Sequence, residues 1–547
     1  MIATVNDTST ITLLSHKVYK LLSMESHVID PDHVPRTDIT WVADRVPGKH
    51  DAEQANRPLE LSFLQSFKGA LLGDSQARET TQYLDDSNEN LIHISNPSTT
   101  AFSYPLMMFS RFPDIPPEDF IQLSVDTFST KCLPKMALLR DIPTNILLRT
   151  DRPRYLTFAM ACMGALASDA PSPVIESLWW ASSILVTAKL EVDNREARKV
   201  DLLNAWVILE TYGILSGNKS ILQRTNMTHG YIETASRRLC LFYPGSKEAD
   251  RMTEQSHQNH VIEKTDRTAI PAFILVDMLR SVQFSLPPTL TTSDLLSRPS
   301  KLSNDYNAIY TNIILKSRPP PVDLRLDSAF LALIAILGEI HTLSTVFHPM
   351  VLIEDYENED TRAKAKTGDK HLHNPFLPFS PEAESRQAYQ KLQKALDLWG
   401  RYYLSRVGKD VAAFFHFCKM YLSEPGLPSL PLIVGYSSDD PRIDVIAFDE
   451  SKMLDSEFSD ASEALKNAWR ILENMEESAE LAPIWYPIVL FYAGLVVWRT
   501  INSQAESGLD GLHLSPRVLQ LFKTELERMK WPCCKGMAET LEKLMTL

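Results

Sequence analysis

Glycine is scarce in this chain, which contains 18 glycines and 34 prolines among 547 residues. Globular proteins use glycine at about 7% of positions, roughly twice the frequency found here. An α/β enzyme with glycine-rich phosphate loops, or an all-β barrel with many tight turns, would need more. With 44% hydrophobic and 23% charged residues, the composition also excludes a wholly disordered, collagen-like or disulfide-scaffold chain. It predicts a large helical protein with proline-punctuated connections.

Closely spaced cysteine pairs are missing as well. No C-x-x-C occurs, and the only close pair is adjacent in sequence, which argues against a zinc finger, a redox pair or any structural metal. The first thirty residues lack a long apolar core, so we expect no secretory signal and a reducing, intracellular compartment. The six cysteines are Cys132, Cys162, Cys240, Cys418, Cys533 and Cys534.

Basic residues are in the minority, with 55 Lys and Arg against 69 Asp and Glu, a net charge of −14. Such a chain repels a phosphate backbone unless it has a concentrated basic cluster. The densest basic groups are only Arg237-Arg238, Arg152 with Arg154, and the three lysines between 364 and 370. We therefore expect no specific DNA binding by this chain alone.

One long uncharged stretch, residues 481–498, approaches the length of a membrane span. Pro483 and Pro487 interrupt its first half and leave a short apolar helix from Ile488. A buried core helix fits this pattern better than a membrane span. We expect no membrane association.

The chain divides by composition into four parts. Residues 1–100, rich in Ser, Thr, Asn and Asp, predict a flexible, poorly ordered leader with one short helix near 61–72. Residues 101–350 predict a helical domain, 351–382 a charged loop, and 383–547 a C-terminal helical part that packs on the same core. Strand alternation is nowhere sustained and no repeat of fixed period occurs, so the predicted fold class is all-α.

Apolar residues at three- and four-residue spacing locate the helices. The predicted helical ranges are 117–132, 154–168, 172–190, 197–212, 220–241, 270–284, 327–346, 383–404, 411–422, 459–473, a segment from 488, and 515–529. Polar loops are predicted over 243–268, 294–310 and 355–381. The predicted core includes Trp206, Leu209, Leu239, Phe284, Trp469 and Trp498.

Residues 213–220 (GILSGNKS) approach the pattern of a phosphate-binding loop. That loop needs glycine directly before its lysine and a buried strand in front of it. Here Asn218 precedes Lys219, and the preceding segment is helical. A glycine-terminated helix followed by a turn is the preferred interpretation.

Two acidic motifs, residues 85–89 (DDSNE) and 439–444 (DDPRID), resemble the aspartate-rich motifs of helical terpene synthases. Such enzymes hold magnesium and a diphosphate with clustered carboxylates. One motif is interrupted by proline and the other lies in the leader, and no second metal motif accompanies them. Exposed acidic turns are the preferred reading, and a magnesium-dependent terpene-synthase-like enzyme remains the alternative function.

Catalytic signatures are absent from the sequence. His371, His373 and His416, the last of them near Cys418, match no tetrahedral metal-ligand spacing. No G-x-S-x-G, H-E-x-x-H or G-x-G-x-x-G occurs. We therefore predict a protein that is not an enzyme, with no catalytic, cofactor-binding or metal-binding residues and no cofactor.

Four segments between 153 and 299 give the chain a family resemblance. They are the Ala-Met…Gly-Ala helix of 153–166, residues 203–219 around Trp206 and Glu210, His229-Gly230 leading to Arg237-Arg238, and Phe273…Asp277…Arg280 followed by Pro287-Pro288-Thr289-Leu290. In order and spacing they resemble the regulatory domain of fungal transcription factors, the middle homology region, in the form that follows C2H2 zinc fingers. The matches cover about a quarter of the chain well.

The chain departs from the family in two respects. The family's E-x-x-R-R reads Asp277-Met-Leu-Arg280-Ser281, and its usual tryptophan is missing from that helix. No Cys/His pair of finger spacing occurs in residues 1–150. Either the zinc fingers are encoded outside this sequence, or the chain is a regulator without its own DNA reader.

The resemblance implies a transcriptional regulator of a metabolic or secondary-metabolite gene set, acting in the nucleus although no clear basic localisation signal is present. Its partners would be proteins of the transcription machinery or a DNA-binding protein. A homodimer is left open.

Overall fold

The structure is a computed structural model. The chain divides into two units, Met1–Leu64 and Gln65–Leu547, and every described residue belongs to the second. The described residues are 91–95, 101–105, 112–136, 138, 152–192, 197, 199–238, 270–289, 301–321, 324–347, 381–436, 460–475, 481–507 and 516–546. The predicted helix near 61–72 and the polar loop 243–268 lie outside them.

The second unit is all-α, as predicted, with fifteen α-helices among the described residues. The first six are α5 (Glu118–Thr127), α7 (Arg154–Ala167), α8 (Ser172–Val192), α9 (Val200–Leu215), α10 (Lys219–Arg238) and α13 (Ile270–Phe284). The others are α14 (Lys301–Ile309), α15 (Leu326–Thr342), α17 (Pro381–Tyr403), α18 (Lys409–Ser423), α19 (Leu430–Ile433), α21 (Ala461–Glu473), α22 (Tyr486–Ser507), α23 (Leu519–Arg528) and α24 (Cys533–Thr546).

One β-hairpin accompanies the helices in the described part. Strand β1 (Leu91–Ser95) pairs antiparallel with β2 (Ala101–Pro105), with Leu91 opposite Pro105. The hairpin was not predicted, because β1 falls in the part interpreted as a flexible leader and neither five-residue strand shows sustained alternation.

Every predicted helical range contains an observed helix, but three helices were missed: α14, α24 and the four-residue α19. The predicted loop 294–310 contains α14, which continues into a π-helical turn, Tyr310–Leu315. Its Ser and Asn residues obscured buried apolar positions at helical spacing, including Leu302, Tyr306 and Ile309. Helix α24 was missed although its buried Met537, Leu541 and Leu544 share one face.

The core predictions are partly correct. Trp206 and Leu209 on α9 are buried, and they belong to a helix whose residues 201–215 are buried on every side. Phe284, Trp469 and Trp498 are only half-buried, because Phe284 is the last residue of α13 and the two tryptophans lie at the edges of their helices. Leu239 lies outside the described residues.

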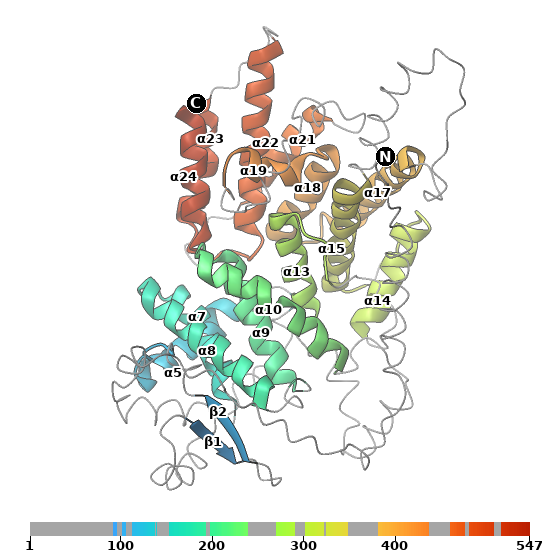
Figure 1. Cartoon of the computed structure of the whole chain (residues 1–547). Helices are drawn as coiled ribbons and strands as arrows, with labels where there is room; N and C mark the ends of the chain where they lie inside the picture. The colour runs from blue at the N-terminus through green and yellow to red at the C-terminus, as the bar shows by residue number, and fades with distance from the viewer. Residues whose placement is uncertain are drawn as a thin grey trace, which may run out of the picture. The chain divides into compact units, whose positions relative to one another are not determined.

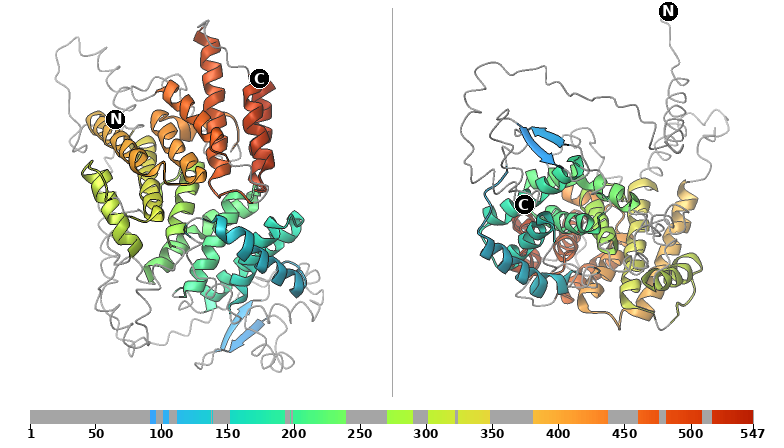
Figure 2. Two further views of the ribbon diagram at one scale, coloured as in Figure 1. Left: turned by 180° about the vertical axis from the view of Figure 1, so that it is seen from behind. Right: turned by 90° about the horizontal axis from the view of Figure 1, so that it is seen from below.

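Helices α5–α10 occupy one part of the unit and α14–α24 another, with α13 between them (Figures 1 and 2). Helix α13 packs against both α9 and α15. The hydroxyl of Tyr492 on α22 donates to the Val282 carbonyl of α13 at 2.9 Å. Near the other end of the chain, Lys530 donates to Asp169 beyond α7 at 2.7 Å. Elements far apart in sequence therefore share one core.

Local sequence explains how helices α5 and α7 pair. Helix α5 begins after Pro117, which has extended backbone dihedrals, and carries Glu118 in its first turn, where a carboxylate opposes the positive end of the helix dipole. Arg154, at the start of α7, forms an ion pair with Glu118 at 2.7 Å. Deeper in the contact, Gly164 allows the backbone of α5 to approach closely, because a Cβ there would lie 1.7 Å from the Ser124 carbonyl oxygen.

Among the described residues, one helical segment is long and apolar enough to cross a membrane, Leu326–Thr345, and 67% of its window is buried inside the molecule. From the sequence, the candidate span was residues 481–498, for which a buried core helix was the preferred interpretation. In the structure α22 begins only at Tyr486, and the residues from Leu481 to Val497 are buried against neighbouring helices.

Candidate functional site

Four charged side chains and a threonine meet in the interior between α9, α10 and α13. Glu210 comes from α9, His229 from α10, and Asp277 and Arg280 from α13. Thr289 follows α13 in the Pro-Pro-Thr-Leu turn. We call these five residues the charged node.

The hydrogen bonds of the charged node centre on the imidazole ring. Nδ1 of His229 lies 2.8 Å from Oε2 of Glu210, and Nε2 lies 2.8 Å from Oδ1 of Asp277. The same Nε2 is 2.9 Å from the Thr289 hydroxyl. Arg280 donates to Oδ1 of Asp277 at 3.2 Å, and the backbone N–H of Thr289 donates to Oδ2 at 2.7 Å. The node therefore joins three helices and a turn.

Burial and hydrogen bonding have opposite effects on the pKa values of His229 and Glu210. The side chains of Glu210, His229 and Asp277 are at most 4% exposed. Burial alone would lower the pKa of His229, but hydrogen bonds to Asp277 and Glu210 outweigh it and raise that pKa to about 9. Burial raises the pKa of Glu210, opposed by its hydrogen bond to His229. The contacts with two acidic side chains therefore favour the protonated form of the His229 ring.

Thr289, His229 and Glu210 have the connectivity of a nucleophile–histidine–acid triad. A triad histidine must be neutral to accept the hydroxyl proton. With a pKa of about 9, His229 is protonated at neutral pH and also faces a second carboxylate, Asp277. The node therefore differs from a catalytic triad in the second acidic contact of His229 and in the protonated form that both contacts favour.

The segment that resembled a phosphate-binding loop is a helix-capping turn, as preferred from the sequence. Gly217 has a φ of +63°, the left-handed region that glycine adopts readily after a helix. The side-chain oxygen of Asn218 accepts hydrogen bonds from the backbone N–H groups of Ser220 and Ile221 at 3.0 and 3.3 Å. Asn218 therefore caps α10, a role that explains asparagine at this position.

The remaining sequence candidates do not assemble into a site within the described part of the chain. His416 bonds through Nδ1 to the Asn467 side chain at 2.9 Å, and Cys418 is buried separately. No group of three or more His, Cys, Asp and Glu side chains in the described ranges is placed to hold a metal ion. His371, His373, Cys240 and both aspartate-rich motifs (85–89 and 439–444) lie outside those ranges.

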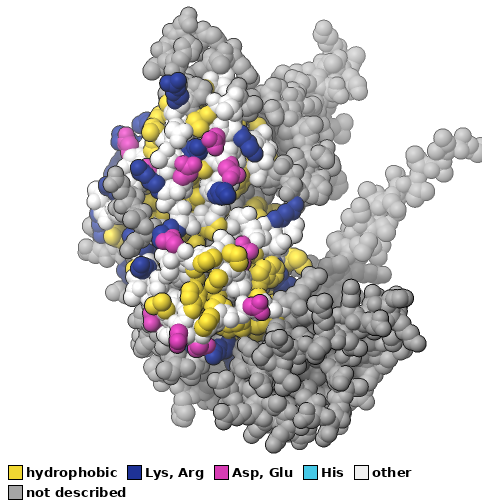
Figure 3. Space-filling view, turned by 90° about the vertical axis from the view of Figure 1, so that its left-hand side faces the viewer, with side chains coloured by type: hydrophobic (Ala, Val, Ile, Leu, Met, Phe, Trp, Pro, Cys, Tyr) yellow, Lys and Arg dark blue, Asp and Glu magenta, His cyan; other side chains and the backbone are white. Residues whose placement is uncertain are grey.

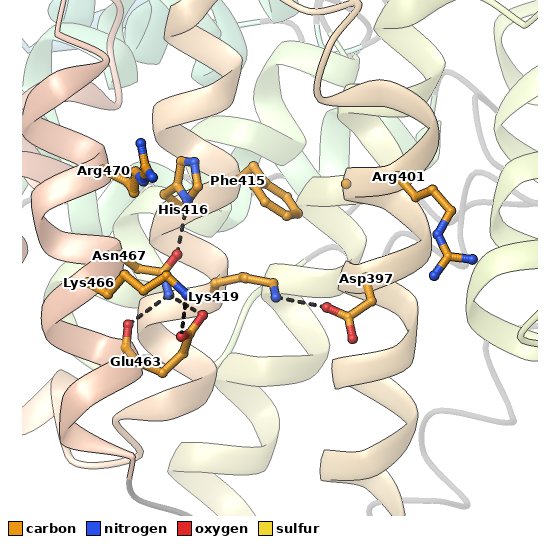
Figure 4. A pocket seen from close by; sticks show the side chains of 10 residues that line it. Asp397, Arg401, Phe415, His416, Lys419, Glu463, Lys466, Asn467 and Arg470 are labelled. Atoms are coloured by element: carbon orange, nitrogen blue, oxygen red, sulfur yellow. Dashed lines mark hydrogen bonds and ion pairs between the residues drawn. The ribbon is translucent and has the colours of Figure 1, made fainter.

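A surface hollow of about 240 Å³ lies between α17, α18 and α21 (Figure 4). Phe415 and His416 lie in it, and Asn467 contributes an amide. Six charged side chains surround them, four basic and two acidic. These are Arg401, Lys419, Lys466, Arg470, Asp397 and Glu463.

This basic group was not predicted from the sequence. Its cations come from three helices: Arg401 from α17, Lys419 from α18, and the other two from α21. No short window of sequence therefore contains two of them except Lys466 and Arg470. Those two lie four residues apart on α21, where i,i+4 side chains share one face of a helix. That spacing was the one signal available in the sequence.

The fold and these sites define the chain as a large all-α protein. Comparison with models of protein families, with curated proteins and with solved structures finds no match for it.

Proposed function

We propose that this chain is a fungal transcriptional regulator that lacks its own zinc-finger DNA reader and acts through protein partners. One observation supports the proposal. Three of the four segments that carry the family resemblance supply every member of the charged node: Glu210, His229, and the Asp277–Thr289 segment.

The fourth segment belongs to the same assembly. It forms α7, whose residues 155–167 are buried, and α7 packs directly against α9. The four matching segments therefore lie in contact with one another in the folded chain. This is expected if they belong to one domain, and not if each match reflects only the apolar spacing of an unrelated helix.

The proposed mechanism is recognition by a folded helical surface. The charged node fixes α9, α10 and α13 relative to one another, and the surface helices present side chains to partners. A chain with net charge −14 has little affinity of its own for DNA phosphates, so a separate DNA-binding protein would bring it to a promoter.

The test supplies the missing reader. The full chain is fused to an unrelated DNA-binding module, and a reporter carrying that module's site is measured in fungal cells across nutrient conditions. We expect the fusion to raise or lower reporter output relative to the module alone. Gel shifts with the unfused chain at physiological salt should show no sequence-selective complex.

A fusion that folds, reaches the nucleus and leaves the reporter unchanged under every condition would contradict the proposal. The terpene-synthase-like alternative would then be tested by incubating the full chain with prenyl diphosphates and magnesium.

A further inference from the structure

The connection between α14 and α15 contains three consecutive prolines, residues 319–321. The chain leaves the π-helical turn after α14 through Ser317, whose φ is +50°. The backbone N–H of Arg318 then donates to the Asn312 carbonyl at 2.7 Å. Residues 318–321 belong to no helix or strand. The prolines therefore follow directly on a point where the chain is held by a hydrogen bond.

The three prolines restrict the backbone of this connection. A proline ring holds its own φ near −65°, and it excludes the residue before it from the helical region and favours polyproline II there. Arg318, Pro319 and Pro320 each precede a proline. The sequence therefore dictates a short polyproline II helix over residues 318–321, and this helix is formed before any partner binds.

Burial distinguishes the three edges of this polyproline II helix. Such a helix has three residues per turn, so Arg318 and Pro321 share one edge while Pro319 and Pro320 lie on the other two. Pro320 is buried, whereas Arg318, Pro319 and Pro321 are exposed. One edge therefore packs on the protein and two edges face solvent. A groove that receives the helix from the solvent side contacts both exposed edges.

A purely structural role accounts for Pro320 but not for the two exposed prolines. The rings of Pro319 and Pro321 remain in solvent, so they remove little apolar surface from water. Among the described residues, no donor is hydrogen-bonded to the carbonyl groups of residues 319–321. Two rings and the carbonyl groups beside them are therefore available to a partner.

Two cations precede the prolines on a molecule that is acidic as a whole. Lys316 and Arg318 are exposed, and residues 315–321 contain no Asp or Glu, although the whole chain carries −14. A carboxylate at the rim of a groove would pair with the Arg318 guanidinium. Leu315, which is 54% exposed, adds one apolar side chain. Two cations are too few to hold a nucleic acid on such an acidic chain.

We propose that residues 315–321 (LKSRPPP) bind the aromatic groove of a polyproline-recognition domain in a partner protein. Pro319 and Pro321 lie against aromatic side chains of the groove, and Arg318 pairs with a carboxylate at its rim. SH3, WW and EVH1 domains have grooves of this chemistry. The inference stands on the connection itself and does not depend on the proposed function.

The test is a binding assay of the full chain on an array of purified SH3, WW and EVH1 domains. Each domain is present in its natural form and with its groove tryptophan replaced by alanine. We expect saturable binding to at least one natural domain that has a carboxylate beside its groove. The corresponding tryptophan variant should not bind, because the aromatic surface for the prolines is lost.

Matched proline substitutions locate the site on this chain. Pro319→Ala with Pro321→Ala should weaken binding about tenfold or more, because two contacting rings and the fixed φ angles are lost together. The control is Pro171→Ala with Pro173→Ala, which replaces two exposed prolines of the same spacing at the start of α8. This control should change binding less than about twofold.

A charge reversal tests the contribution of the cation. Arg318→Glu should weaken binding about tenfold or more, and the control Lys535→Glu makes the same change of charge at an exposed position of α24. Helix α24 lies on the left-hand side of Figure 1 and α14 on the right. Figure 3 shows the left-hand side, where Lys and Arg side chains are interspersed with Asp and Glu. This control should change binding less than about twofold.

Every substituted side chain is exposed, so circular dichroism and thermal melts should show all the variants folded. If Pro319→Ala with Pro321→Ala unfolds the chain, Pro319→Ala alone serves instead and should weaken binding in the same direction. Absence of saturable binding to any domain of the array, equal weakening by the matched controls, or binding that survives loss of the groove tryptophan would each overturn the proposal.

Discussion

At the scale of single residues, the charged node shows how a helical core tolerates four ionisable groups. An isolated buried charge is costly, and a buried pair is tolerated only when hydrogen bonds satisfy its remaining atoms. Here Asp277 accepts from His229, Arg280 and the Thr289 backbone, whereas Oε1 of Glu210 and Nε of Arg280 are buried without a hydrogen bond among the described residues. Removing one member leaves its partners buried without compensation.

His229→Ala should therefore destabilise the protein by about 3–5 kcal/mol, because it leaves Glu210 and Asp277 facing each other without the imidazolium. His416→Ala is the matched control, since His416 has one side-chain hydrogen bond, to Asn467, at the surface; it should cost about 1 kcal/mol. Urea unfolding of the two variants measures both values. Equal losses would show that the node contributes nothing beyond ordinary packing.

The pKa of His229 also predicts a pH dependence of stability. Its folded pKa, about 9, lies above the ordinary histidine pKa of 6.5, so the folded state binds the proton more tightly than the unfolded state. The stabilisation is complete below pH 6.5 and is lost as the pH rises through 9. The melting temperature should fall over that window in the natural protein and fall less in His229→Gln. Identical pH profiles would rule out this role of His229.

The sequence drew attention to the segments that hold the charged node but did not predict that its residues are in contact. Those segments carry the family resemblance and contain Glu210, His229, Asp277 and Arg280. The spacing of these residues along the chain gives no sign of their contact. Their contact depends on the tertiary arrangement of α9, α10 and α13. Trp469 and Trp498 were predicted to be buried and are only half-buried. An apolar stripe on a helix predicts which face is turned toward the core, but not how deeply each side chain on that face is buried.

At the scale of elements, most helices could be predicted because apolar residues recur every three or four positions over several turns. Helix α14 was not predicted because Ser and Asn residues are mixed among its apolar positions, and α19 because it is only four residues long. Helix α24 was missed although its buried apolar residues share one face. The close approach of α5 to α7 was not predictable, since Gly164 looks in sequence like any other small residue in an Ala-rich helix.

Two glycine substitutions test that approach. Gly164→Ala would place a Cβ 1.7 Å from the Ser124 carbonyl oxygen, so α5 must shift, and we expect a loss of about 1–3 kcal/mol. Gly230→Ala, on the exposed side of α10, meets nothing within 4 Å and should stabilise the protein by up to about 1 kcal/mol. Thermal melts of both variants give the comparison. A Gly164→Ala variant as stable as Gly230→Ala would mean that the α5–α7 contact is looser than described.

At the scale of the whole molecule, α13 ties the two groups of helices together. It packs on α9 and α15, and its Val282 carbonyl accepts from Tyr492 of α22. The start of α24 reaches the first group as well, because a Cβ on Gly217 would lie 3.2 Å from the Cα atom of Cys533. Contacts of this kind couple the stability of the two groups.

Two substitutions in different groups of helices should therefore both lower the free energy of one common unfolding transition. Trp206→Ala on α9 and Phe414→Ala on α18 remove buried rings, and each should cost about 3–5 kcal/mol through cavity formation. Because α13 connects their surroundings, Trp206→Ala should accelerate amide hydrogen exchange in α18 and α22 as well as in α9 and α10. Phe414→Ala should do the reverse. If each variant accelerated exchange only in its own group of helices, the groups would be separate folding units, and the contacts of α13 with α9 and α15 would be too weak to couple them.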